Sequence, residues 1–141
     1  DVAPSRGLGD VYKRQDLYND FENYINHRNN TSTTRKEDLT HRFYTLMMDN
    51  YREHKEVIFY ADKLHVSSKY LSEVVKETSG KSPKDWIIDY SLLEIKELLK
   101  NSSLNIQEIT IRTKFLNQSA LGRFFKRHTN MSPSEYREST Y

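Results

Sequence analysis

Apolar residues recur at the three- and four-residue spacing of amphipathic helices from about residue 38 almost to the end of the chain. No segment shows the sustained alternation of apolar and polar residues that marks a half-buried strand. Asp38 is placed to cap the first predicted helix. The apolar face of that helix would carry Leu39, Phe43, Leu46, Met47 and Tyr51. The pattern therefore predicts an all-α fold.

Six further helices are expected, separated by residues that cap or stop helices. Their approximate ranges are Glu56–Leu64, Ser68–Thr78, Pro83–Lys100, Ile106–Thr113, Gln118–Thr129 and Pro133–Arg137. Gly80 is a stop signal, and the run Asn101-Ser102-Ser103 ends the longest helix. Ser82 and Ser132 each precede a proline, so each can cap a helix whose first turn holds that proline. The total is about seven helices.

The second half of this region repeats the first. Residues Leu71, Val74, Val75, Lys76 and Ser82-Pro83 recur 50 positions later as Leu121, Phe124, Phe125, Lys126 and Ser132-Pro133. Upstream, Val57, Tyr60, Ala61 and Val66 recur 49 positions later as Ile106, Ile109, Thr110 and Phe115. The change in offset puts one extra residue between the two short helices of the second copy. Two short helices joined by a tight turn, present twice, are typical of tandem helix-turn-helix units.

The long helix predicted over Pro83–Lys100 carries two apolar stripes. One stripe consists of Ile88, Leu92, Ile95 and Leu99, and the other of Trp86, Tyr90 and Leu93. A helix with two apolar faces is buried on both sides, which predicts that this helix lies between the two repeat units and bridges them. A helix lying on a membrane surface is the rival interpretation, but its polar strip is half acidic, which anionic lipid does not favour.

The chain before residue 38 differs in character. Residues 1–15 have no helical or strand periodicity and resemble a translated, non-native adapter sequence, with a disordered native tail as the alternative. We expect residues 16–37 to form a short amphipathic helix and a polar linker left by a missing upstream domain. A dimer-forming strip is the other interpretation of that helix. Residues 38–141 then form the domain that contains the repeat.

Composition excludes several kinds of chemistry. The chain has 141 residues, a net charge of only +2 and no cysteine, so disulfides, thiolate metal sites and cysteine nucleophiles are ruled out. None of its apolar runs approaches the roughly 20 residues of a membrane span. No two of the five histidines have the HExxH spacing, and no glycine-rich phosphate loop or G-x-S-x-G elbow occurs. We therefore predict no catalytic residue, no metal site, no cofactor and no enzyme activity.

The outward face of one helix in each repeat unit is polar. In Ser68–Thr78 these residues are Lys69, Ser72, Glu73 and Lys76, and in Gln118–Thr129 they are Ser119, Gly122, Arg123 and Lys126. His128 falls on the inward side and is expected to be partly buried. Side chains of the outward types reach base edges and phosphates. A solvated helix face is the plainer interpretation, but the tight turns and the duplication favour contact with DNA.

These features resemble the DNA-binding module of AraC-type transcription regulators. The first helix-turn-helix of that family is similar to Val57–Gly80, its connecting helix to Lys81–Lys100, and its second unit to Asn105–Arg137. The resemblance implies two helix-turn-helix subdomains bridged by a helix. It also implies sequence-specific binding of double-stranded DNA, activation of transcription at promoters through RNA polymerase, and a place on the nucleoid in bacterial cytoplasm. Such modules usually follow a sensing or dimerising domain, so we expect a monomeric fragment and a full-length protein that could dimerise.

The family's roles, carried over by position, imply two sets of DNA contacts. Base contacts fall to Ser68, Lys69, Ser72, Glu73, Gln118, Ser119 and Arg123. Phosphate contacts fall to Ser67, Lys76, Asn117, Lys126 and Arg127.

The second unit departs from the family pattern at several positions. Lys114 stands where glycine is usual, at a cost of roughly 1 kcal/mol if its φ is positive, although His65 fills the equivalent place in the first copy. Gly122 lies inside a recognition helix, at roughly 1 kcal/mol relative to alanine. Thr110 and Thr113 take inward positions where small apolar residues are usual. We expect a less stable or less selective second unit.

A protein-interaction module that kept this fold without binding DNA is the alternative function. The low net charge mildly favours it, because DNA-binding domains are usually more basic.

Overall fold

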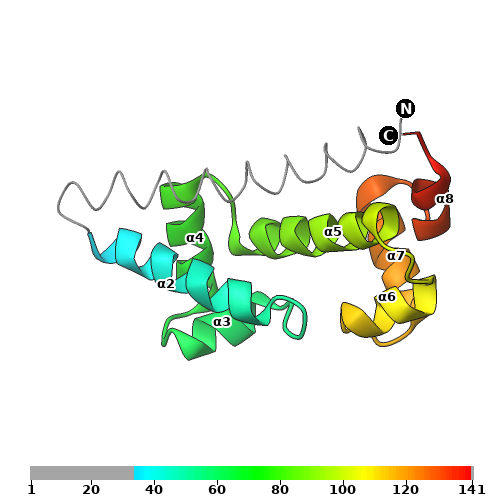
Figure 1. Ribbon diagram of the computed structural model, residues 1–141. Helices are drawn as coiled ribbons and strands as arrows, with labels where there is room; N and C mark the ends of the chain where they lie inside the picture. Colours follow the sequence, from blue (N-terminus) through cyan, green and yellow to red (C-terminus); the bar gives the residue numbers. More distant parts are fainter. Residues whose placement is uncertain (1–33, 141) are drawn as a thin grey trace. The chain divides into compact units, whose positions relative to one another are not determined.

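The computed structural model describes residues 34–140, and these residues form α-helices without a strand. Figure 1 labels the helices from α2 onward. Their bounds are α2 (Arg35–Asn50), α3 (Val57–Lys63), α4 (Ser68–Ser79), α5 (Pro83–Asn101), α6 (Ile106–Arg112), α7 (Gln118–Thr129) and α8 (Pro133–Glu138). The predicted all-α fold with about seven helices is confirmed for this part of the chain. The expectations for residues 1–15 and for the helix at 17–28 lie outside the described residues.

The described chain divides into two compact units, and the division falls inside α5 between Tyr90 and Ser91. The N-terminal unit (residues 34–90) contains α2, α3, α4 and the first part of α5. The C-terminal unit (residues 91–140) contains the rest of α5 with α6, α7 and α8. The continuous helix α5 is therefore the bridge between two helix-turn-helix units, as predicted (Figure 1).

Helix α2 begins earlier than the sequence pattern predicted. Its N-cap is Thr34, whose side chain accepts a hydrogen bond from the backbone N–H of Glu37 at 3.1 Å. The Glu37 carboxylate in turn accepts from the backbone N–H of Thr34 at 2.7 Å, which completes a capping box. The assignment of Asp38 as the cap was wrong, because Asp38 lies inside the first turn of α2. Residues 35–37, which the sequence assigned to the segment before the domain, are therefore part of α2.

The core of the N-terminal unit lies between α2, α3, α4 and the start of α5. The ring of Phe43 meets that of Tyr60 edge-on at 5.4 Å, and both side chains are fully buried. Trp86 is only 3% exposed, its ring packs against Tyr44, and its indole Nε1 donates to Ser79 Oγ at 3.0 Å. Trp86 and Tyr90, from the stripe of α5 that also includes Leu93, are thus buried within this unit.

The core of the C-terminal unit forms around Ile95 and Leu99, from the stripe of α5 that also includes Ile88 and Leu92. Its buried members are Ile95, Leu99, Ile109, Leu121, Phe125 and Tyr136. Helix α8 is tied to the end of α5, since Arg137 Nε donates to the carbonyl of Leu99 at 2.9 Å. Lys100 Nζ donates to the carbonyl of Ser139 at 2.9 Å. The two stripes differ in position along α5 as well as around it, so one helix supplies core residues to both units.

The repeat extends to individual hydrogen bonds. Ser79 Oγ donates to the carbonyls of Val75 at 2.6 Å and Lys81 at 3.1 Å. Fifty positions later, Thr129 Oγ1 donates to the equivalent carbonyls at 2.8 and 3.1 Å. Gly80 and Asn130 follow these residues, and both end their helix with a left-handed backbone, at φ 83° and 64°.

Candidate nucleic-acid interface

Equivalent backbone hydrogen bonds close the turn in both units. In the first turn they run from the N–H groups of Leu64, His65 and Val66 to the carbonyls of Tyr60, Asp62 and Ala61. In the second they run from Thr113, Lys114 and Phe115 to Ile109, Ile111 and Thr110. The matching distances differ by no more than 0.1 Å. Both units therefore present their second helix, α4 or α7, from a turn of one geometry.

The extra residue of the second turn is Leu116. Val66 matches Phe115 and Ser67 matches Asn117, so Leu116 has no counterpart in the first turn. Its side chain is 91% exposed and immediately precedes α7. The insertion is accommodated outside the packed part of the unit, which explains why the core repeats on both sides of it.

Ser67 and Asn117, two predicted phosphate contacts, are the N-caps of α4 and α7. Ser67 Oγ accepts from the backbone N–H of Tyr70 at 3.0 Å, and Asn117 Oδ1 accepts from that of Ala120 at 2.8 Å. Each cap uses an oxygen acceptor, so the Ser67 hydroxyl hydrogen and the Asn117 amide hydrogens can still donate. A helix N-terminus carries a partial positive charge and favours phosphate. The caps are compatible with the predicted role, and they also position both helices.

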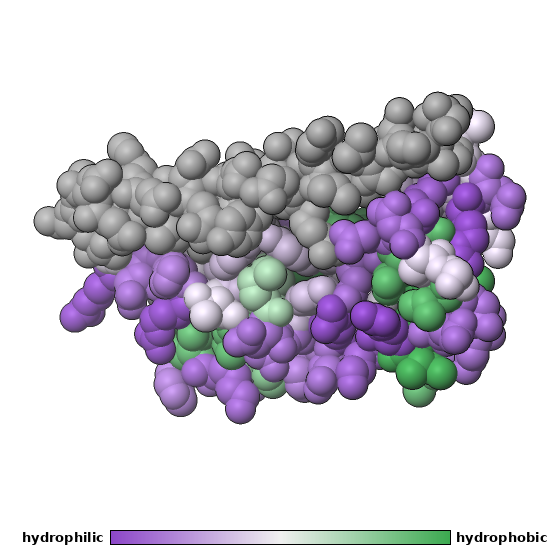
Figure 2. Space-filling model, in the orientation of Figure 1, coloured by the Kyte–Doolittle hydropathy of each residue, from purple (hydrophilic) through white to green (hydrophobic). Residues whose placement is uncertain are grey.

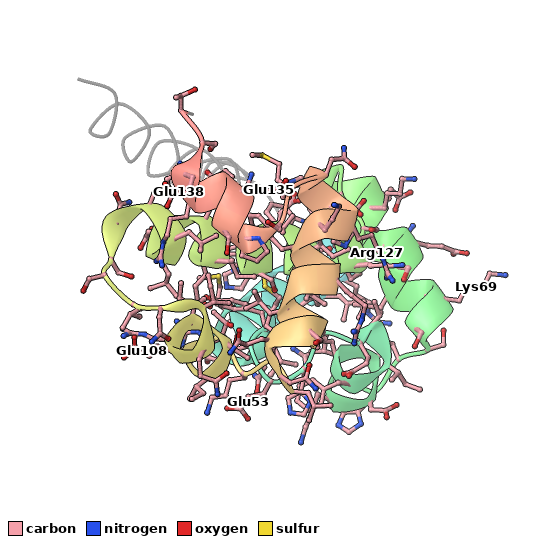
Figure 3. The ribbon with its side chains drawn as sticks, turned by 90° about the vertical axis from the view of Figure 1, so that its right-hand side faces the viewer. Glu53, Lys69, Glu108, Arg127, Glu135 and Glu138 are labelled. Atoms are coloured by element: carbon pink, nitrogen blue, oxygen red, sulfur yellow. The ribbon has the colours of Figure 1, made fainter. Side chains whose placement is uncertain are left out.

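The predicted contacts on α4 share one face, at spacings of one, four, five and eight residues. Lys69, Glu73 and Lys76 are exposed, whereas Ser68 and Ser72 are half-buried. Figure 3 shows Lys69 extending from the helix away from its own unit. The face also carries Glu77, whose carboxylate forms an exposed 3.0 Å ion pair with Lys36 of α2. Acid and base are thus balanced along α4.

The predicted contacts on α7 are exposed throughout, and their charge differs from that of α4. Gln118, Ser119, Arg123, Lys126 and Arg127 all lie at the surface. Helix α7 contains no aspartate or glutamate, whereas α4 contains two glutamates and two lysines. Figure 3 shows Arg127 at the side of α7. The C-terminal unit therefore has the more positive recognition helix.

The predicted partial burial of His128 was wrong. His128 lies at the exposed surface, and its ring meets the ring of Phe124 edge-on at 4.9 Å. The apolar face of α7 is narrower than the periodicity indicated, with Leu121 and Phe125 fully buried and Phe124 only partly so. His128 therefore belongs to the rim of the core.

Lys114, Thr110 and Thr113, which differ from the usual family pattern, can be placed in the structure of the second unit. Lys114 has a φ of 65° and His65 a φ of 59°, so both turns hold a non-glycine residue in the left-handed region. Thr110 and Thr113 are buried, and their hydroxyls donate to the carbonyls of Ile106 and Ile109 at 2.7 Å each. The buried hydroxyls are thereby satisfied within α6 and do not require a polar partner in the core.

Sequence reasoning missed one residue next to the predicted contacts. Gln107 of α6 accepts a hydrogen bond through Oε1 from Gln118 Nε2 at 2.8 Å. The two residues are eleven positions apart and meet only because the turn folds α7 back against α6. The available signal was a polar residue near the start of α6, the helix that precedes the turn leading to the predicted base contacts of α7.

Residues 34–140 contain no group of three metal-ligating side chains, and none of their helices could cross a membrane. Figure 2 shows mainly hydrophilic residues on the visible face of the described chain, with smaller apolar patches. Ile58, Ile111 and Leu116 are the most exposed large apolar residues of this part, at 60%, 65% and 91%.

The fold and its two exposed recognition helices define a tandem helix-turn-helix protein. The family model described as "Helix-turn-helix domain" matches residues 60–139, more than half of the chain. The chain belongs to this family, the AraC-type helix-turn-helix domains of DNA-binding transcription regulators, and the resemblance noted in the sequence is confirmed.

Similar proteins agree with this assignment. The chain is 28% identical to the uncharacterized HTH-type transcriptional regulator YdiP of Escherichia coli over 118 residues, which is 83% of this chain and 39% of that protein. It is 31% identical to the Msm operon regulatory protein of Streptococcus mutans over 78 residues, covering 55% and 28%. The lactose operon transcription activator of Staphylococcus xylosus is 26% identical over 101 residues, covering 72% and 36%. The chain spans between about a quarter and two fifths of these relatives.

Solved structures share the fold. The C-terminal domain of the response regulator AraT from Geobacillus stearothermophilus superposes with a TM-score of 0.63 at 24% identity, covering 76% of this chain and 87% of that one. The DNA-binding domain of AdpA, solved in complex with a target DNA, superposes with a TM-score of 0.59 at 23% identity, covering 70% and 88%.

Proposed function

We propose that this chain binds double-stranded DNA sequence-specifically, through α4 and α7, as the DNA-binding part of a transcription regulator. The observation that carries the proposal is the duplicated turn: two recognition helices leave turns with matching hydrogen bonds, and each presents an exposed polar face. In helix-turn-helix proteins the N-terminal part of the second helix contacts base edges in the major groove. Family membership and the relatives named as regulators support the same conclusion.

Within this proposal the residues divide by the end of the helix they occupy. Ser68, Lys69, Ser72 and Glu73 of α4, with Gln118, Ser119 and Arg123 of α7, read bases because they lie on the first turns. Ser67, Asn117, Lys76, Lys126 and Arg127 contact phosphates, either as caps or from further along the helix. The greater positive charge of α7 makes the C-terminal unit the main source of phosphate attraction.

The proposed mode of binding follows from the presence of two recognition helices in one chain. We propose that α4 and α7 enter successive major-groove segments on one side of the duplex, about 34 Å apart. The fragment then binds as a monomer and needs no palindromic site. The native regulator would dimerise through an upstream domain, activate transcription by contacting RNA polymerase, and act on the nucleoid in the bacterial cytoplasm. The relative named as a transcription activator supports activation.

A selection from random duplexes, followed by titration against salt, tests the proposal. We expect a bipartite motif and an affinity that falls as salt rises, with a log–log slope of about −0.9 for each phosphate contact. Lys84→Gln, which removes one exposed charge from α5 and none from α4 or α7, is the control and should leave the salt slope unchanged. Binding to no duplex, or binding independent of salt, would overturn the proposal.

A protein-interaction module of the same fold is the second candidate. The observations that favour it are the exposed apolar side chains of Ile111 and Leu116 in the C-terminal unit and the low net charge. If this candidate is correct, Leu116→Ser weakens binding to a partner protein, and Arg123→Ala has no effect on the chain's activity in the cell. The DNA-binding proposal requires the opposite result for Arg123.

A further inference from the structure

A side-chain hydrogen bond joins the two helices of the C-terminal unit at the surface that the proposed function assigns to DNA. Gln118 is the first residue of α7, and Gln107 is the second residue of α6. Gln118 Nε2 donates to Gln107 Oε1 at 2.8 Å, and both side chains are exposed. The bond adds nothing to the core, so its consequence has to be sought at the surface.

The hydrogen bond leaves the adenine-reading groups of Gln118 available. A glutamine reads adenine in the major groove with its oxygen accepting from N6 and its nitrogen donating to N7. The Gln118 carboxamide has two N–H hydrogens, and the bond to Gln107 uses one of them. The adenine pair uses Oε1 and the hydrogen on the same side of the amide, and the other hydrogen can serve the bond to Gln107 at the same time. The contact with Gln107 therefore orients the amide without occupying the groups that discriminate.

Orientation matters here because glutamine is among the side chains with the most rotamer freedom to lose on ordering. An exposed Gln118 without a partner would sample many rotamers. Its amide could also turn by 180°, which exchanges the positions of the oxygen and the nitrogen. In the structure the Gln107 oxygen faces Gln118 and accepts from its nitrogen, and this bond holds the Gln118 amide in one of its two orientations.

We infer that Gln107 is a positioning residue that holds the Gln118 amide for recognition of one adenine by the C-terminal unit. This inference rests on the proposed function, in which the start of α7 enters the major groove. It adds a residue outside the recognition helix, and it names the base that this end of α7 selects.

The N-terminal unit lacks this pair. The position equivalent to Gln107 is Ile58 of α3, which is likewise exposed, and the position equivalent to Gln118 is Ser68. A serine hydroxyl can both donate and accept, so it discriminates poorly between bases. The adenine preference is therefore expected in the half of the DNA motif read by α7 and not at the matching position of the other half.

The test compares dissociation constants for the selected duplex and for duplexes changed at single base pairs. For the unsubstituted protein we expect one position at which adenine is preferred by about 5- to 150-fold. At that position 7-deazaadenine, which lacks the N7 acceptor, should bind about as weakly as a wrong base. Gln118→Ala should abolish the preference, and Gln107→Ala should reduce it several-fold while leaving preferences elsewhere in the motif unchanged.

Two further variants separate positioning from a general effect. Gln107→Glu keeps an oxygen acceptor for Gln118 Nε2, so it should retain the adenine preference while its negative charge weakens all duplexes alike. Ile58→Ala is the matched control in the N-terminal unit and should leave the adenine preference unchanged. All of these side chains are exposed, so thermal unfolding should show that each variant is folded.

The possible outcomes distinguish the inference from the proposed function. If the unsubstituted protein binds selectively but Gln107→Ala has no more effect on base preference than Ile58→Ala, the inference is wrong and the proposed function stands. A loss of preference in Gln107→Glu equal to that in Gln107→Ala also overturns it. If no duplex is bound selectively, both fail together.

Discussion

His65 and Lys114 lie at the same point of the two turns, and both have a left-handed backbone, with φ values of 59° and 65°. Each donates its backbone N–H to a carbonyl three residues earlier at 3.2 Å. A residue with a side chain is strained by roughly 1–2 kcal/mol in this region. The two turns therefore carry the same strain, and the second unit is not exceptional in holding Lys114 where glycine is usual.

Replacing either residue by glycine should stabilise the protein. Lys114→Gly and His65→Gly each relieve the left-handed strain, and the greater entropy of glycine in the unfolded chain offsets part of the gain. We expect a net increase of about 0.5–1 kcal/mol in the free energy of unfolding, measured by urea titration. Lys126→Gly inside α7 is the matched control and should cost about 1 kcal/mol. Destabilisation by both turn variants would contradict this account.

Trp86→Ala should be strongly destabilising. The ring is buried against Tyr44, and its Nε1 donates to Ser79, so truncation leaves a large cavity in the N-terminal unit. The expected loss is about 3–5 kcal/mol in the free energy of unfolding. Lys84→Ala, two residues earlier on the exposed side of α5, should stay within about 0.5 kcal/mol of the parent. Equal effects of the two substitutions would show that Trp86 is not a core residue.

Glu135 should contribute to the acid sensitivity of the C-terminal unit. Hydrogen bonds with Ser132, including one from its backbone N–H to Glu135 Oε1 at 2.7 Å, hold the pKa of this carboxyl below its ordinary value. A lowered pKa in the folded state means that the ionised form stabilises the fold. Its contribution is complete above the unfolded pKa of about 4.3 and is lost as pH falls through the lower folded value.

Glu135→Gln should therefore remove part of the decline in stability on acidification. Thermal unfolding measured between pH 7 and pH 2.5 checks this, with Glu138→Gln at the end of α8 as the control. Figure 3 labels both carboxylates on that helix. A variant whose melting temperature falls with pH as steeply as the parent's would contradict the prediction.

Arg123 and Lys126 should have separable effects on DNA binding. Arg123 lies nearer the start of α7, and its planar fork can pair with guanine O6 and N7. Arg123→Ala should relax the preference at one base pair by about 1–3 kcal/mol. Lys126→Ala should weaken all duplexes alike and reduce the salt slope by about one unit. The roles are wrong if Lys126→Ala changes the selected motif and Arg123→Ala does not.

The position that matches Arg123 in the N-terminal unit is Glu73, which can only accept a hydrogen bond and would repel a phosphate. Its suitable partner is cytosine N4. The two halves of the motif should therefore differ in kind, and the base preferences of the same selection check this. A motif with two equivalent halves would contradict it.

Much of the fold could be predicted from residues close together in the sequence. Ser82 and Ser132 before their prolines, and Gly80 after its helix, act through local backbone chemistry, and the structure has helix boundaries where they predict them. The repeat was visible for the same reason, because equal local signals produce equal turns. The start of α2 was missed although Thr34 and Glu37 have the T-x-x-E spacing of a capping box, because Asp38 stands directly before the first apolar residue of the pattern.

The exposure of the charged predicted contact residues and of the α7 contacts also followed from helical periodicity, since a helix with one apolar face must present the other. Periodicity could not decide whether a residue at the edge of the apolar face is buried or exposed, and it wrongly assigned His128 to the buried side. Nor could it reveal that Gln107 meets Gln118. That contact depends on the angle at which the second turn sets α7 against α6, which hydrogen bonds and core packing determine together. The sequence by itself determined the helices, the repeat and the polar faces, because these depend on neighbouring residues, while the tertiary structure alone decided which side chains of different helices come within hydrogen-bonding distance.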